Sequence, residues 1–172
     1  MDIRKELLQE HSKANKDRIA AYLIKHPDGV DGLMKLFFGE DTRLVQHAAW
    51  VVGTLGEQAP SLITPFFPAM IDRIKRKEAK VAFRRNVFRV MQFQRIDEAL
   101  WGDVYDLCID ILMNKTEPIA VKVFAMSTAL NIVKELPELK NELKIAVEDV
   151  VENGSKGEVS RGQKVLAALS KL

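Results

Sequence analysis

Apolar residues recur at intervals of three and four along almost the whole of this 172-residue chain. No segment alternates strictly between apolar and polar residues with turn residues at both ends, which is the pattern of a half-buried strand. The pattern therefore predicts an all-α protein. Proline, glycine and small polar residues interrupt it often, so the connections are short and neighbouring helices are expected to lie antiparallel.

The interruptions divide the chain into nine predicted helical segments. They are 2–26 (one helix or a bent pair), 29–38, 42–56, 60–76 with a start disturbed by prolines, 79–94, 98–113, 117–135, 138–152 and 157–171. Asn15 is a plausible N-cap inside the first segment but does not force a break there, so both readings stay open. In the turn at 153–157, Gly154 is predicted to cap the end of the preceding helix.

The later helices fall into pairs that repeat about every 40 residues. The second helices of these pairs have acidic starts at Asp41, Glu78, Glu117 and the Gly157–Glu158 step, spaced 37, 39 and about 40 residues apart. Apolar residues coincide in this register at Leu44, Val81 and Ala120, and the same depth in the last unit falls on Val159 or Ser160. One helix pair of this size cannot bury its apolar face alone, so such pairs stack on one another and form a solenoid.

The segment from Asp41 to Leu55 resembles the second helix of a HEAT repeat. It has the acidic start, β-branched residue, small residue and apolar-glycine ending of that pattern, in Asp41, Val45, Ala49, Val52, Gly53 and Leu55. The resemblance covers about residues 28–172 as four units, with 2–26 as an N-terminal cap. It implies a single domain over residues 1–172, folded as a right-handed α-α superhelix of about four to five helix pairs. The chain also looks similar to HEAT-like proteins of the DNA alkylation repair superfamily.

Two parts of the chain depart from the HEAT pattern. Arg84, Arg85 and Asn86 stand where small residues would be expected, and Gly162 and Lys164 lie within the last predicted helix. Charge is also distributed unevenly, although the net charge is only +2. Nine basic residues and two acidic ones lie between Asp72 and Arg95, whereas the next stretch, to Asn114, contains five acidic residues and no basic one.

In HEAT-like solenoids the second helices line the concave face, where partners usually bind. The resemblance therefore implies a partner surface formed by polar residues of these helices: Gln46, His47, Arg84, Arg85, Arg89, Lys122 and Arg161. Guanidinium groups bind carboxylates and phosphates through paired, charge-assisted hydrogen bonds. The expected partner is thus an acidic protein segment or another anion. The alternative is that each cation is solvated on its own helix or pairs with acids such as Asp103 and Asp106.

Residue patterns typical of enzymes are absent from the chain, which has no glycine-rich phosphate loop, nucleophile elbow, HExxH or paired-cysteine motif. We therefore predict no catalytic residue, no cofactor and no metal. An imidazole such as that of His47 could act as a general base, but nothing nearby in the sequence completes a catalytic set. Asp103, Asp106 and Asp110 share one helix face, where a solvated acidic surface is favoured over a cation site. Cys108, between Leu107 and Ile109, is predicted to be buried.

Three functions remain open at this stage. The favoured one is a non-catalytic interaction module with a basic concave face. The second is a nucleic-acid-binding or glycosylase-like protein of the alkylation repair kind, which needs an aromatic side chain and a carboxylate beside the basic groove; Trp50 and Asp103 are the available candidates. The third is an assembly module, in which Leu33, Phe37, Phe38, Phe66 or Phe67 leaves an apolar patch for self-association.

Cysteine content and apolar run lengths bear on the location of the protein. A single cysteine forms no intramolecular disulfide, which favours a reducing compartment. The first residues carry no secretory or transit signal, and no apolar run approaches the roughly 18 residues that span a bilayer. We therefore expect a cytoplasmic protein that is a monomer or a weak homodimer and has no membrane partner.

Overall fold

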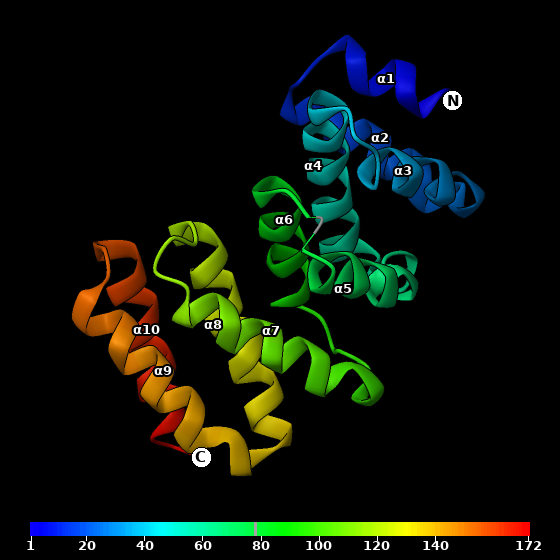
Figure 1. Ribbon diagram of the computed structural model, residues 1–172. Helices are drawn as coiled ribbons and strands as arrows, with labels where there is room; N and C mark the ends of the chain where they lie inside the picture. Colours follow the sequence, from blue (N-terminus) through cyan, green and yellow to red (C-terminus); the bar gives the residue numbers. More distant parts are fainter. Residues whose placement is uncertain (78) are drawn as a thin grey trace. The chain divides into compact units, whose positions relative to one another are not determined.

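The computed structural model describes residues 1–77 and 79–172, which form ten α-helices and no β-strand (Figure 1). The predicted all-α fold is therefore confirmed. The helices belong to two units, Met1–Gln94 and Arg95–Leu172. The first unit contains α1 (Ile3–Gln9), α2 (Lys13–Lys25), α3 (Val30–Phe37), α4 (Thr42–Gln58), α5 (Phe67–Lys75) and α6 (Val81–Met91). The second contains α7 (Trp101–Met113), α8 (Ile119–Glu135), α9 (Lys140–Asn153) and α10 (Lys156–Leu169).

The first predicted segment, 2–26, is a pair of helices. Ser12 caps α2, since its hydroxyl accepts a hydrogen bond from the backbone N–H of Asn15 at 3.1 Å. Asn15 is buried, and its amide donates to the carbonyls of Glu6 at 2.8 Å and Glu10 at 2.9 Å. Asn15 is therefore not the N-cap of α2. It lies in the first turn of α2, and its side chain satisfies carbonyl groups that the end of α1 leaves without helical partners.

Several helices begin later than the apolar periodicity predicts. One short 3-10 turn leads into each of α3, α7 and α9. Two further turns, Pro60–Leu62 and Thr64–Phe66, precede α5. Proline fixes φ and lacks an N–H, so it fits a first turn without extending the helix backwards. Pro118 likewise places the start of α8 at Ile119 and leaves Glu117 outside the helix. Asp41, predicted as the acidic start of this helix, is the N-cap of α4 and accepts hydrogen bonds from two backbone N–H groups. Glu78 lies outside the described residues.

Helix α4 is the centre of the first unit and packs against α1, α2, α3 and α6. Small residues allow close approach: a Cβ atom added at Gly56 would lie 2.6 Å from Val90 of α6. Phe37 stacks on Phe83 with ring centroids 4.6 Å apart. The structure corrects the suggestion of an apolar surface patch here, because Leu33, Phe37 and Phe67 are almost completely buried, and Phe38 and Phe66 are half-buried.

In the second unit, α8 packs against α7, α9 and α10. Helices α9 and α10 come close at Gly162, where an added Cβ would lie 2.3 Å from Val151. The two helices are joined by a tight turn in which Gly154 caps the end of α9, as predicted, and Ser155 with Glu158 forms a capping box at the start of α10. An added Cβ at Gly154 would lie 2.3 Å from the Val150 carbonyl oxygen, so this position needs glycine.

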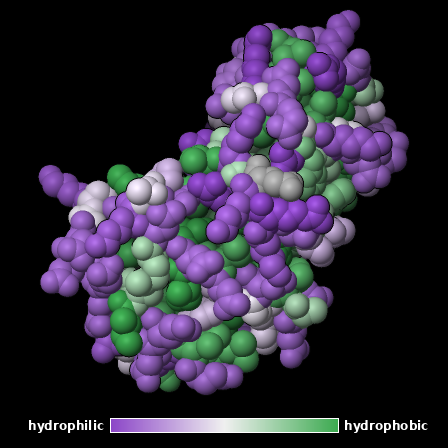
Figure 2. Space-filling view, in the orientation of Figure 1, coloured by the Kyte–Doolittle hydropathy of each residue, from purple (hydrophilic) through white to green (hydrophobic). Residues whose placement is uncertain are grey.

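Hydrophilic side chains cover most of the face seen in Figure 2, and apolar residues reach the surface in separate places among them. Among the helices that the structure describes, none is long and apolar enough to cross a bilayer.

Candidate interaction groove

Six side chains of the first unit line a groove of about 360 Å³, which we call the α4–α6 groove. They are Gln46 and Trp50 of α4, Arg85, Asn86 and Arg89 of α6, and His11 from the turn between α1 and α2. A groove of this volume is within the range of small-ligand and side-chain binding sites. Its walls combine two guanidinium groups, two amides, an imidazole and an indole.

Helical spacing explains how the two walls form. Gln46 and Trp50 are four residues apart on α4, as are Arg85 and Arg89 on α6, so each pair lies on one helix face. Gly53 lies one turn beyond Trp50, and a Cβ added there would be 3.8 Å from the guanidinium carbon of Arg89. The Arg89 guanidinium thus lies over Gly53. Because glycine has no side chain, α4 leaves space here for the arginines of α6 along the groove.

The polar side chains of the groove differ in how strongly other residues hold them. Arg89 lies 3.7 Å from Glu57, and both side chains are partly exposed, which makes the pair weak. Asn86 is buried and donates a hydrogen bond to the Ala82 carbonyl at 2.7 Å. Arg85 and Gln46 are exposed, and within residues 1–77 and 79–172 neither has a hydrogen-bond or ion-pair partner. These two side chains are available to a ligand.

Two aromatic rings line the groove, those of His11 and Trp50. The imidazole of His11 lies 4.8 Å from the half-buried indole of Trp50 and 4.1 Å from the imidazole of His47. The Lys16 ammonium sits over the same indole at 5.5 Å. The Nδ1 atom of His47 lies 2.5 Å from the Leu7 carbonyl oxygen, so Nδ1–H donates and fixes this ring against α1. Desolvation, and then the charges of His47 and Arg43, lower the pKa of His11 below its ordinary value.

The structure brings together three of the residues implied by the HEAT resemblance: Gln46, Arg85 and Arg89. His47 contacts His11 but does not line the groove. Arg84 is half-buried and donates to the Ala79 carbonyl at 2.7 Å. Lys122 and Arg161 belong to the second unit, so a row of cations through both units stays a prediction. The sequence had suggested Trp50 as an aromatic partner, whereas nothing in it singles out His11.

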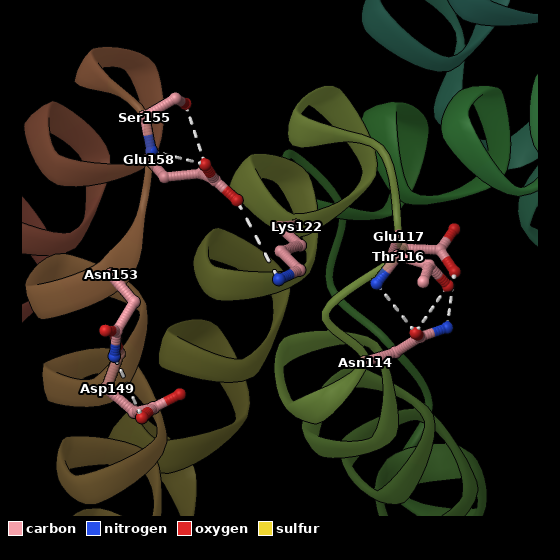
Figure 3. A network of polar contacts seen from close by, with 8 residues as sticks. All are labelled: Asn114, Thr116, Glu117, Lys122, Asp149, Asn153, Ser155 and Glu158. Atoms are coloured by element: carbon pink, nitrogen blue, oxygen red, sulfur yellow. Dashed lines mark hydrogen bonds and ion pairs between the residues drawn. The ribbon is translucent and has the colours of Figure 1, made fainter.

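Contacts within the second unit hold both Lys122, shown in Figure 3, and Arg161, which is not drawn there. The Lys122 ammonium lies 3.8 Å from the Glu158 carboxylate, and both side chains are less than a tenth exposed. The other oxygen of Glu158 accepts hydrogen bonds from the backbone N–H and hydroxyl of Ser155, each at 2.7 Å. Arg161 donates to the Ser127 hydroxyl at 2.7 Å. These contacts tie α10 to α8, and we leave Lys122 out of the proposed partner surface.

Most of the basic strip between Asp72 and Arg95 is also paired. Arg73 pairs with Glu40 at 3.1 Å, Arg76 with Asp72 at 2.7 Å, and Lys80 approaches Glu40 at 3.9 Å. These side chains, except Lys80, line a second hollow of about 560 Å³ whose charges therefore largely cancel. Lys75 and Arg84 have interaction partners as well. The strip is not a continuous row of available cations, and Arg85 is an exception within it.

A family model described as a HEAT repeat domain matches residues 3–167 of the chain. This chain belongs to the HEAT repeat domain family. HEAT repeats are commonly protein-interaction modules, and the all-helical structure agrees with this membership. Among curated proteins and among solved structures, no match to the chain was found.

The second unit of this HEAT repeat protein carries the other side chains that the sequence suggested. Asp103, Asp106 and Asp110 are exposed along α7, and in the part of the chain that the structure describes no group of three His, Cys, Asp or Glu residues could hold a metal ion. Burial raises the pKa of the Cys108 thiol, which is fully buried as predicted. Burial and Glu142 raise the pKa of the Tyr105 phenol, whose hydroxyl donates to the Leu139 carbonyl at 3.2 Å.

Proposed function

We propose that this HEAT repeat protein is a non-catalytic interaction module and that its α4–α6 groove binds an acidic segment of a partner protein. The proposal rests on two donors, Arg85 and Gln46, that have no partner in the described part of the chain and lie on opposite walls of one groove that also contains Arg89. A polar side chain gains most from a ligand when no neighbour already satisfies it.

A carboxylate in this groove would find donors on both sides. Arg85 offers its guanidinium for a bidentate pair, and the Gln46 amide offers a further N–H group. Arg89 can exchange its contact with Glu57, at 3.7 Å, for a closer one with the ligand, because exposed ion pairs contribute little to stability. The indole of Trp50 supplies an apolar surface for the methylene groups of a glutamate or for a neighbouring apolar side chain.

The alternative is a nucleic-acid-binding or glycosylase-like protein of the alkylation repair kind. The position of Trp50 beside Arg85 and Arg89 favours it, since bases stack on aromatic rings while arginines bind phosphate. A long polyanion, however, needs many available cations along its path. Arg73, Arg76 and Lys80 already have acidic neighbours, which is why the acidic protein segment is the preferred partner.

The experiment compares two anions with the same protein. Fluorescence anisotropy would follow binding of a rhodamine-labelled hexaglutamate peptide and of labelled 20-nucleotide DNA, single- and double-stranded, at about 50 and 200 mM salt. The test variant is Arg85→Glu with Arg89→Glu. The matched control is Lys25→Glu with Lys35→Glu, which changes the net charge equally at exposed positions of α2 and α3, outside the groove.

We expect the peptide to bind the wild type and the control variant but not the groove variant. Loss of binding in both variants would mean that net charge, and not the groove, attracts the peptide. DNA binding that falls steeply with salt, without peptide binding, would replace the proposal by the nucleic-acid alternative.

A further inference from the structure

His11 occupies an unusual position for an exposed histidine, because its ring contacts two other aromatic rings at the edge of a basic groove. The charged and titratable groups that surround it come from every neighbouring helix. They are Glu10 after α1, Lys16 of α2, Arg43 and His47 of α4, and Arg85 and Arg89 of α6. These cationic groups outnumber the nearby carboxylates, which are Glu10 and, beside Arg89, Glu57, so the groove itself disfavours a proton on His11.

This environment changes when an anion enters. The pKa of His11 is lowered by desolvation and by the charges of His47 and Arg43. A carboxylate held by Arg85 and Arg89 would bring negative charge to the groove wall that His11 forms and would favour the imidazolium. Proton and ligand then strengthen each other's binding by the same factor, as linkage requires.

We propose that binding of an acidic segment in the α4–α6 groove draws a proton onto His11, so that the groove binds its partner more tightly in mildly acidic solution. This inference rests on the proposed function and adds its regulation. The sign follows from the direction of the change: a histidine whose pKa rises on binding takes up a proton, so affinity increases as pH falls through the pKa of the bound state. It stops increasing once the free protein is protonated as well.

The two tryptophans make His11 directly observable. Trp50 contacts His11 and Trp101 lies in the second unit, so Trp101→Phe leaves one indole that reports on the groove. An imidazolium quenches the fluorescence of an indole in contact with it more strongly than a neutral imidazole does. Fluorescence of this variant would be titrated from pH 8 to about 5.8, where glutamates stay ionised, with and without saturating hexaglutamate.

The peptide is expected to move the quenching transition upward by at least about half a pH unit, which corresponds to about a threefold gain in affinity at the acidic end. His11→Gln should remove the transition and the pH dependence of peptide affinity while peptide binding itself persists. His47→Gln is the control for the second imidazole and should keep both effects.

Peptide binding tests the proposed function, and the pH dependence of that binding tests the role of His11. If hexaglutamate does not bind at any pH, the proposed function is wrong and the inference falls with it. If it binds with equal affinity at pH 5.8 and 7.5, or if His11→Gln keeps the pH dependence, only the proton-coupled mechanism is overturned. The wild-type affinities decide this even if one variant fails to fold.

Discussion

Removing one partner of the buried pair of Lys122 and Glu158 should destabilise the protein much more than removing one partner of an exposed pair at the same distance. The Lys122 ammonium lies 3.8 Å from the Glu158 carboxylate, with 9% and 8% of the two side chains exposed. Glu158→Gln keeps a side-chain oxygen for the Ser155 backbone N–H, because glutamine also forms capping boxes. The substitution therefore removes the ion pair and leaves a buried ammonium without its counter-charge, which costs about 3 kcal/mol.

Helix α9 offers a matched control. Lys144 and Glu148 lie 3.7 Å apart with 53% and 51% of their side chains exposed. Glu148→Gln should cost no more than about 0.5 kcal/mol, because exposed i,i+4 pairs contribute little. With a urea m-value of about 1.5–2 kcal/mol/M, the midpoint should fall by about 1.5–2 M for Glu158→Gln and hardly change for Glu148→Gln. Fluorescence of Trp101 in a Trp50→Phe background follows the second unit.

A double-mutant cycle separates the pair from the rest of the network. Lys122→Met should cost less than Glu158→Gln, since Ser155 still donates two hydrogen bonds to the remaining carboxylate. The double variant should recover part of the loss. Equal, small effects of Glu158→Gln and Glu148→Gln would refute the reasoning and would return Lys122 to the candidates for partner binding.

Two further predictions concern packing and reactivity. Gly56→Ala should destabilise the protein by about 1 kcal/mol, because overpacking against Val90, 2.6 Å from the added Cβ, outweighs the gain in helix propensity. Gly32→Ala, with nothing within 4 Å of the added Cβ, should be neutral or stabilising. Urea unfolding of the two variants compares their stabilities. Cys108 should react with a thiol reagent at pH 8 only as fast as the protein opens, since burial raises the pKa of its thiol. Rapid reaction in the native state would contradict its burial, and rates with and without 6 M guanidinium measure the difference.

Helix periodicity alone was enough to predict the all-α fold, because the apolar stripe of each helix is a local property of the sequence. The starts of helices were less predictable. Proline-containing 3-10 turns preserve helical spacing of apolar residues but lie outside the α-helices, as at Pro60–Leu62. The cap of α2 is Ser12, whereas the sequence suggested Asn15, whose side chain instead serves the end of α1.

The candidate groove was predictable only in part. Gln46, Arg85 and Arg89 follow from the second-helix positions of the repeat. His11 joins them through the packing of the α1–α2 turn on α4, a contact between residues far apart in sequence. Lys122 was predicted to be part of the partner surface from its position on a second helix. In the structure its side chain is buried and pairs with Glu158 of α10. Spacing along one helix does not reveal which face a neighbouring helix occupies.

The central claim, that the α4–α6 groove is the partner-binding site, is tested most directly by nuclear magnetic resonance of the two indole N–H groups. The chain has one tryptophan in each unit: Trp50 lines the groove, and the indole of Trp101 donates to the Ile96 carbonyl. As hexaglutamate is added to ¹⁵N-labelled protein, we expect the Trp50 signal to move and saturate while that of Trp101 stays in place. Movement of the Trp101 signal alone, or of neither signal while the peptide binds, would contradict the account.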